Sequence, residues 1–311
     1  MNARIDDISA DRPPHGDRPA AGDVSGLAHL ILCHKLPEQV ARLAGRLRHP
    51  DDVVVIHVDR KTDLGPFRRA LDEAGLNPAD VVLLEDRCEV NWGDFGSVAA
   101  SLHALQVALA HHRPWSRAIL LSGQCYPIKP RREILRTLAA SGDRSFVQTD
   151  DTDDFGRLLC RHFTLFGRRF RVPNRFTAGL PPPRRLPLGL RPAKGAAWWI
   201  LTREAAAWIT AYSAEHPELE AFFRRSFIPD ENYYQVVIQN SEHRDRIIND
   251  HLRHQVWENW HPTILRASEA PAMVANDRLF ARKFDITIDA EVLDEIDRRL
   301  AEQELNHTRT T

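Results

Sequence analysis

Short apolar runs alternate with amphipathic stretches along the first half of the chain. The runs are four to eight residues long and end in polar or turn-forming residues, which is typical of buried strands. They cover residues 27–33, 52–59, 81–85, 117–123 and 144–150. Between them, apolar residues recur at helical spacing, as in Val40, Leu43 and Leu47 after Pro37. Strands that alternate with helices in this way predict βαβ units and a mostly parallel central sheet.

The second half of the chain is less regular. Residues 157–194 contain ten Arg or Lys and no Asp or Glu, and we expect a long loop with little regular structure. A strand and a helix are predicted over 195–209, a helix from about Pro229, and a C-terminal helix over 289–304. We expect one domain over 26–305, with a disordered tail at 1–25 and a short tail at 306–311.

Composition excludes several classes of protein. The net charge of −1 gives no reason to expect a nucleic-acid partner. The four cysteines form no C-x-x-C pair, so a zinc ribbon is not indicated. No apolar run approaches the roughly 20 residues of a membrane span, and residues 1–25 lack the apolar core of a secretory signal. We therefore expect a cytoplasmic protein, with peripheral contact to a membrane left open.

Ligands of open parallel sheets bind beyond the carboxyl ends of the strands. By that rule, we expect four features to lie together at one edge of the sheet: His34, Asp59, Trp92 and the 122–124 turn. Neither G-x-G-x-x-G nor G-x-x-x-x-G-K-[ST] is present, so dinucleotide and P-loop sites are weakly supported. A nucleotide-sugar enzyme remains, but the Asp-x-Asp that often holds a metal there is replaced by Ser-Gly-Gln. The acidic run TDDTDD at 149–154 is an alternative metal site or a solvated turn.

Seven segments, in order, resemble the core-2/I-branching β-1,6-N-acetylglucosaminyltransferases and their peptide O-xylosyltransferase relatives. They are CHKLPEQVARLAGRL, IHVDRK, NWGDFGSVAA, LSGQCYPIKPRREI, KGAAWWILTRE, IPDENYYQVVIQN and LFARKFD, between about residues 28 and 288. The resemblance implies a GT-A-like α/β fold without the Asp-x-Asp. It also implies inverting, metal-independent transfer from a UDP-sugar, with no cofactor. A cytoplasmic location and few cysteines would make this a bacterial-type member.

The resemblance also implies roles for individual residues. Glu231 matches the catalytic base, in the first turn of a helix where the dipole favours its ionised form; Asp230 is expected to cap that helix. Lys283 matches the lysine that binds the diphosphate, with Arg282 beside it, and a fixed cation there would stabilise the leaving charge as a metal does elsewhere. Arg266 is a weaker match to a second arginine.

Asp59, His34 and Trp92 are the expected contacts of the nucleoside, although Trp92 could equally fill the core. Trp257 matches a tryptophan that stacks on the acceptor sugar, or it too is core. Gln124 and Arg161 are further acceptor-side candidates.

The donor stays open between UDP-GlcNAc, which we favour, and UDP-xylose. The acceptor is expected to be a glycan, a lipid-linked sugar or another glycoconjugate, and the basic stretch 157–194 favours an anionic one. The alternative to an enzyme is a non-catalytic module that binds a UDP-sugar or a carbohydrate.

Overall fold

The computed structural model describes residues 26–151, 161–165, 168–172, 184–259 and 261–308. The predicted tail at 1–25 lies outside these residues. At the other end, helix α10 (Val292–Thr308) continues into the segment expected to be a tail. Its Val292, Ile296 and Leu300 are fully buried, which confirms the predicted helical register.

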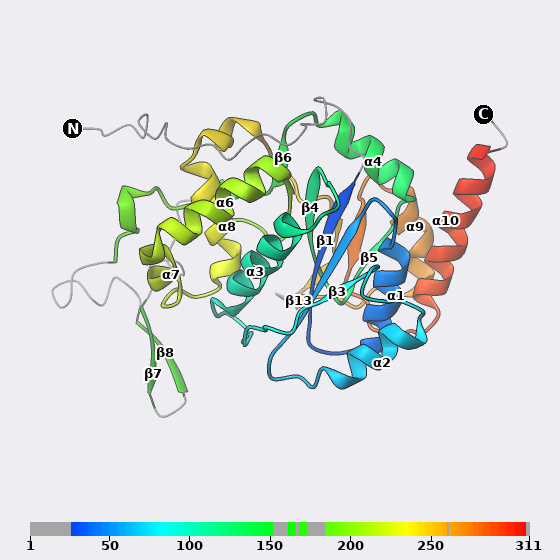
Figure 1. The fold of residues 1–311 in the computed structure, drawn as a ribbon, viewed down its shortest axis with the longest axis horizontal. Helices are drawn as coiled ribbons and strands as arrows, with labels where there is room; N and C mark the ends of the chain where they lie inside the picture. Colours follow the sequence, from blue (N-terminus) through cyan, green and yellow to red (C-terminus); the bar gives the residue numbers. More distant parts are fainter. Residues whose placement is uncertain (1–25, 152–160, 166–167, 173–183, 260, 309–311) are drawn as a thin grey trace.

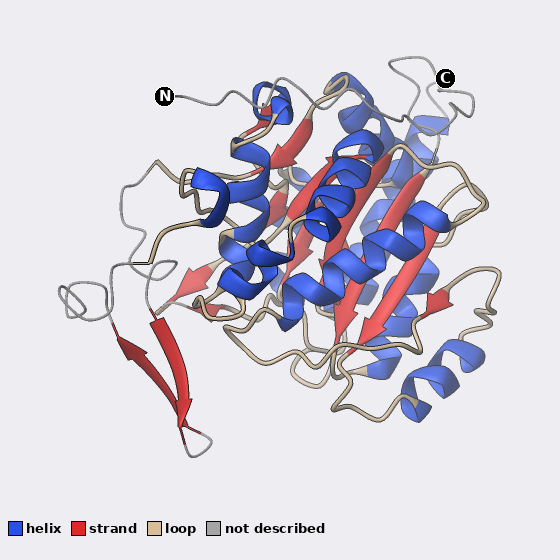
Figure 2. Ribbon diagram, turned by 60° about the vertical axis from the view of Figure 1, so that its left-hand side comes forward, coloured by secondary structure: helices blue, strands red, loops and turns tan. Residues whose placement is uncertain are grey.

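A seven-stranded sheet forms the centre of the molecule (Figures 1 and 2). Its order is β10-β6-β9-β4-β1-β2-β3, and only β9 runs antiparallel to its neighbours. The mostly parallel α/β sheet confirms the predicted fold class. The strands are β1 (Leu27–Cys33), β2 (Val53–Val58), β3 (Val82–Leu83), β4 (Arg117–Ser122), β6 (Ser145–Val147), β9 (Trp199–Thr202) and β10 (Ile247–Ile248).

Helices cover both faces of the sheet, because its central strands are apolar on both sides. Along β2, Val53 and Val55 pack into one core cluster, whereas Val54 and Ile56 pack into the other. The first face carries α3 (Gly96–Ala110), α6 (Arg203–Glu215), α7 (Pro217–Phe223) and α8 (Tyr233–Gln239). The second carries α1 (Pro37–Leu47), α2 (Gly65–Glu73), α4 (Arg131–Ala140), α9 (Ala270–Ala275) and α10.

A small second sheet lies beside the carboxyl end of β4. It contains β11 (Arg253–His254), β14 (Phe280–Arg282) and β5 (Cys125–Pro127), in that order. Arg282 is the register partner of Cys125, directly after the 122–124 turn. This pairing brings residues 280–282 to the edge of the main sheet where a ligand is expected.

Two further hairpins are present. β12 (Trp257–Glu258) pairs with β13 (His261–Pro262). β7 (Arg161–Leu165) pairs with β8 (Arg168–Val172), and this hairpin extends away from the body in both views (Figures 1 and 2). The expectation of little regular structure over 157–194 was therefore wrong for these ten paired positions. β-Structure depends on partners across a turn, which composition alone does not show.

The described residues also include the 3₁₀ turns η2 (Pro187–Gly189), η3 (Pro229–Glu231), η4 (Glu242–Arg246) and η5 (Ala267–Glu269). The helix predicted from Pro229 is in fact η3 followed by the separate helix α8. Asn232 lies between them with φ −135° and ψ −36°, so it interrupts the helical path. In the part of the chain that the structure describes, no helix combines the length and apolarity of a membrane span.

A buried carboxylate at the opposite end of β1 provides a test of the fold. Asp52 is 1% exposed and accepts hydrogen bonds from the Arg131 guanidinium at 2.6 and 2.9 Å and from the Leu27 N–H at 3.0 Å. Burial by itself raises the pKa of Asp52, but the hydrogen bonds from Arg131 and His29 hold it well below its usual value. Its ionised form therefore stabilises the native state.

We predict that Asp52→Asn lowers the free energy of unfolding by about 3 kcal/mol at pH 7, since Arg131 then loses its charged partner. Because the native pKa is depressed, the deficit should be full above about pH 4 and shrink as the pH falls further. Urea denaturation at pH 7 and pH 3 measures both effects. Asp51→Asn, at the exposed neighbouring position, should stay within about 0.5 kcal/mol of wild type; equal losses in the two variants would contradict the assignment.

Candidate active site

The site begins where three parallel strands end side by side. β1, β2 and β4 deliver His34, Asp59 and the 122–124 turn to one edge of the sheet. The Asp59 N–H donates to the Cys33 carbonyl at 2.8 Å, and the Gly123 N–H donates to the Leu32 carbonyl at 3.0 Å. The grouping of His34, Asp59 and Gln124 therefore follows from the register of the strands.

Asp59 organises the loops on the β2 side of this edge. It is 6% exposed, and its Oδ1 accepts the backbone N–H groups of Lys61 at 3.0 Å and of Val90 at 3.3 Å. Its Oδ2 lies 3.4 Å from the Lys61 Nζ. Lys61 Nζ also donates to the Asn91 side chain at 2.6 Å, so a lysine that sequence reasoning did not single out connects Asp59 to the loop that carries Trp92.

Lys283 belongs to a group of cations at the same edge. Partial burial, followed by repulsion from Lys35 and Arg282, lowers the pKa of its ammonium group. Burial also lowers the pKa of His34, which interacts electrostatically with Lys35, Asp59 and Lys283. Lys35 is paired with Asp285 at 2.8 Å, whereas no carboxylate within the described residues lies in contact with Lys283. The sheet edge thus presents Lys283 as a cation suited to an anionic ligand.

Two glutamines hold the segment after Lys283. Gln39 donates from Nε2 to the Gly123 and Phe284 carbonyls at 2.8 and 3.2 Å, and its Oε1 accepts the Ile286 N–H at 3.0 Å. Gln124 is 8% exposed and donates to the Phe284 carbonyl at 2.9 Å. The side chain of Gln124, predicted on the acceptor side, is therefore used to anchor the segment that follows Lys283.

Glu231 is the last residue of the 3₁₀ turn η3, separated from α8 by Asn232, and does not lie in the first turn of an α-helix as predicted. The dipole argument for its ionisation consequently does not apply in the form expected. The Glu231 carbonyl accepts the Gly195 N–H at 2.8 Å, so the strand-like segment before β9 supports the turn. Neither cap of η3 or α8 uses the Asp230 side chain, so the expected capping role of Asp230 was wrong.

Asp230 instead interacts electrostatically with Arg282. Its Oδ1 is buried and has no hydrogen-bond partner among the residues described. Burial raises the pKa of Asp230 to about 6, against the opposing effects of a hydrogen bond from Ser97 and the charge of Arg282. Burial also lowers the pKa of Arg282, and its guanidinium lies 4.5 Å from the centre of the Trp198 ring. The turn that carries Glu231 is thereby coupled electrostatically to β14.

The loop that carries Trp92 packs against the residues before Glu231. Trp92 meets the Phe227 ring edge-on at 5.3 Å, and the Ile228 N–H donates to the Gly93 carbonyl at 3.1 Å. Gly93 has φ +76°, and a Cβ there would lie 2.8 Å from the Phe227 ring, so glycine is required. Trp92 is 77% exposed, which excludes the reading that it fills the core.

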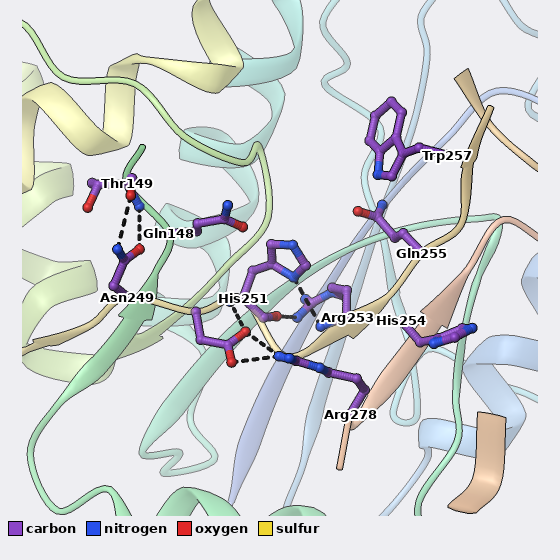
Figure 3. A pocket seen from close by; sticks show the side chains of 10 residues that line it. Gln148, Thr149, Asn249, His251, Arg253, His254, Gln255, Trp257 and Arg278 are labelled. Atoms are coloured by element: carbon purple, nitrogen blue, oxygen red, sulfur yellow. Dashed lines mark hydrogen bonds and ion pairs between the residues drawn. The ribbon is translucent and has the colours of Figure 1, made fainter. Parts of the chain in front are cut away.

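Trp257 stands at the mouth of a pocket of about 490 Å³ on the other side of β14 (Figure 3). It is 56% exposed, so it too is not a core residue. The pocket is lined by Gln148, Thr149, Asn249, Asp250, His251, Arg253, His254, Gln255, Trp257 and Arg278.

Arg161 begins β7 and was predicted on the acceptor side, but its side chain lies outside the described part of the chain.

The two remaining sequence candidates have limited support. In the described ranges no three His, Cys, Asp or Glu side chains are arranged to hold a metal ion, and residues 152–154 of the acidic run lie outside them. Arg266 donates to the Ile288 carbonyl at 2.8 Å, although its neighbour Leu265 bonds to the Lys283 carbonyl. Arg266 thus lies near Lys283 but is used to stabilise the loop before α10.

Sequence reasoning missed Lys61, Trp198 and the electrostatic link between Asp230 and Arg282. Lys61 lies two residues after the predicted strand 52–59, so its position near a strand end was the available signal. Trp198 meets Arg282 from a segment 84 positions away in the sequence, and no local pattern reports such a contact.

A mostly parallel sheet with a cationic ligand edge and no Asp-x-Asp at the end of β4 defines a GT-A-like α/β protein. The chain belongs to the Core-2/I-branching enzyme family, whose profile matches residues 27–278.

Curated relatives are similar over most of this chain. "Xylosyltransferase oxt" of Drosophila pseudoobscura pseudoobscura is 25% identical over 92% of this chain and 34% of its own length. Human "Xylosyltransferase 1" is 22% identical over 87% of this chain and 30% of its own length. "Xylosyltransferase 2" of Rattus norvegicus is 22% identical over 90% of this chain and 34% of its own length. The chain spans about a third of the length of these relatives.

The enclosed charge of Asp230 leads to a prediction on stability. Its native pKa of about 6 lies above its unfolded value, so its ionised form opposes folding, and the stability present at low pH is lost as the pH rises through 6. Asp230→Asn should therefore raise the free energy of unfolding at pH 8 by about 1–3 kcal/mol, and by much less at pH 4.

Urea denaturation at both pH values tests this expectation. Asp245→Asn, which removes a carboxylate that is 83% exposed, is the matched control and should change little. A loss of stability in Asp230→Asn at pH 8 would show that the ionised carboxylate is a net stabilising group.

Proposed function

We propose that this chain is a glycosyltransferase that moves a sugar from a UDP-sugar to an acceptor hydroxyl with inversion at the anomeric carbon. The proposal is supported by membership of the Core-2/I-branching enzyme family and by the electrostatic link between the turn that carries Glu231 and β14, since Asp230 interacts with Arg282 and Arg282 repels Lys283. The names of the similar curated proteins support a transferase as well.

In the proposed reaction, Glu231 takes the proton of the acceptor hydroxyl as its oxygen attacks the anomeric carbon of the donor. The bond between that carbon and the diphosphate oxygen breaks on the opposite face, and UDP leaves with the bonding electrons. A single displacement inverts the configuration. The products are the glycosylated acceptor, UDP and the proton held by Glu231.

Lys283, with Arg282 behind it, would stabilise the charge that develops on the leaving diphosphate. Cations held in place before the reaction begins need no reorganisation in the transition state. Lys283 has an ammonium group without a contacting carboxylate among the described side chains, which suits this role. We therefore propose transfer that requires neither a metal nor another cofactor. On the same edge, His34, Asp59 and Trp92 are proposed to contact the nucleoside.

Two donors are candidates. The sequence segments resemble enzymes that use UDP-GlcNAc, whereas the curated relatives are named xylosyltransferases, which supports UDP-xylose. The acceptor is proposed to be a glycan or other glycoconjugate, bound on the side of Trp257, and the protein is proposed to act in the cytoplasm. A non-catalytic module that binds UDP-sugars is the alternative.

We predict that Glu231→Gln lowers transfer by about 10²–10⁴-fold, because the amide has no basic oxygen for the hydroxyl proton. UDP affinity should change little, because Glu231 is proposed to act on the acceptor. Release of UDP from a panel of UDP-sugars in EDTA, with UDP binding measured by calorimetry, gives both quantities and names the donor.

The outcomes of that experiment separate the alternatives. UDP binding without release in wild type, unchanged by Glu231→Gln, would favour the non-catalytic module. Release that appears only after Mg²⁺ or Mn²⁺ is added would contradict metal-independent transfer. Asp245→Asn, far out on the surface, serves as the fully active control.

Lys283→Ala should weaken UDP binding by about 10–100-fold, since a charge-assisted contact to phosphate is worth roughly 1.5–3 kcal/mol. The affinity for uridine, which has no phosphate, should be nearly unchanged. Arg244→Ala removes a surface cation that is 60% exposed and provides the control. Equal weakening of UDP and uridine by Lys283→Ala would point to a general disturbance of the edge.

A further inference from the structure

The pocket below Trp257 has an unusual balance of hydrogen-bonding groups. Among the described residues that line it, the one carboxylate is that of Asp250, which accepts the Arg278 guanidinium on both oxygens at 2.6 Å and two backbone N–H groups on Oδ1. Asn249 is occupied as well, since its amide exchanges hydrogen bonds with the Thr149 backbone at 2.7 and 3.0 Å. The side-chain oxygens of Asp250 and Asn249 are therefore already used as acceptors.

Several N–H donors of the pocket are not used in this way. The Nε atom of Arg253 and the Nε2 atom of Gln255 are buried and have no hydrogen-bond partner within the described residues. His251 accepts the Arg253 N–H at its Nδ1 at 3.0 Å. Burial lowers the pKa of His251 to about 4, so the neutral ring carries its proton on Nε2, on the side towards Gln255 in Figure 3.

Arg253 is a buried cation that packs on the Phe280 ring and interacts electrostatically with Asp250, but it forms no ion pair with a carboxylate of the described residues. It is 3% exposed, and its two Nη groups donate to the His251 and Leu120 carbonyls, not to a carboxylate. Burial lowers the pKa of Arg253 to about 10, so it remains a cation at neutral pH. Arg278 and Asp250 neutralise each other, whereas no carboxylate among the residues placed by the structure is in contact with Arg253. A buried cation with an unsatisfied N–H favours an anionic partner.

The pocket adjoins the turn that carries Glu231. Its wall residue Gln148 accepts a hydrogen bond from Gln235 of α8 at its carbonyl, at 3.3 Å. The next residues run beside the 194–196 segment, in which Gly195 donates to the Glu231 carbonyl. On the other side Arg253 interacts electrostatically with Arg282. The 194–196 segment thus contacts both the wall of the pocket and the turn that carries Glu231.

We propose that this pocket binds an anionic oxygen group, a carboxylate or a phosphate, carried by the acceptor sugar. Gln255, His251 and Arg253 supply the N–H donors and the charge, and Trp257 packs on the apolar face of the sugar ring. The proposal rests on the proposed function only in calling the ligand an acceptor. It names the acceptor class: an acidic glycan, such as one that contains a uronic acid or a sugar phosphate.

The test measures binding without donor or turnover. Saturation-transfer NMR titrations of the full chain use methyl β-D-glucuronide, glucose 6-phosphate and the neutral methyl β-D-glucoside. We expect one of the two anionic sugars to bind about tenfold more tightly than the neutral one. Gln255→Glu, of equal size, should weaken that anion about tenfold and leave the neutral sugar unaffected, whereas Trp257→Ala should weaken both alike.

Gln303→Glu is the matched control, because it makes the same change of charge at an exposed position on α10. UDP titrated into the same samples reports on the intact fold and tests the donor site separately. Equal binding of the neutral and anionic sugars, no binding of any sugar by a protein that binds UDP, or an anion affinity that Gln255→Glu leaves unchanged would overturn the proposal. Absent UDP binding would instead count against the proposed function.

Discussion

The hydrogen bonds from Gln39 and Gln124 to the 284–286 backbone hold the candidate site together. Gln39 spans α1, the 122–124 turn and the end of the chain, and it is 1% exposed. Buried amides with full sets of partners fix their neighbours, because a lost partner leaves a desolvated group unsatisfied. Lys283 is placed beside His34 and Asp59 by this link between positions about 250 residues apart, and not by any local preference of the FARKF segment.

The second organising feature is the pair of charged side chains, Asp230 and Arg282, that lies next to the candidate site residues Glu231 and Lys283. Asp230 Oδ1 and Arg282 Nε are both buried without a hydrogen-bond partner among the described residues, and the two side chains interact electrostatically. Such an arrangement costs stability, and natural proteins retain it mainly where function requires it. Arg253 is a second buried cation, and it lines the pocket proposed to bind the acceptor. Arg253 and Arg282 thus lie on the adjacent strands β11 and β14.

Strand and helix periodicity predicted the first half of the fold closely. The runs at 27–33, 52–59 and 117–123 became β1, β2 and β4 because each is apolar on both faces, as a covered parallel strand must be. Around Glu231 the same reasoning failed in detail: Pro-Asp-Glu looks like a helix start, but the backbone at Asn232 breaks the path between η3 and α8. The hairpin of β7 and β8 was missed for a similar reason, since its pairing is not encoded in charge composition.

Three features could be predicted from the sequence alone: the class of fold, the edge of the sheet that carries the candidate site, and the ordered segments that relate the chain to its family. These features depend on local periodicity and on the rule that parallel strands present their carboxyl ends together. Tertiary packing determined the rest: that Trp92 and Trp257 are exposed, that Gln124 is an anchor, and that Asp230 interacts with Arg282. Each of these facts depends on contacts between distant segments, and burial and pairing of a side chain are properties of its neighbours in space.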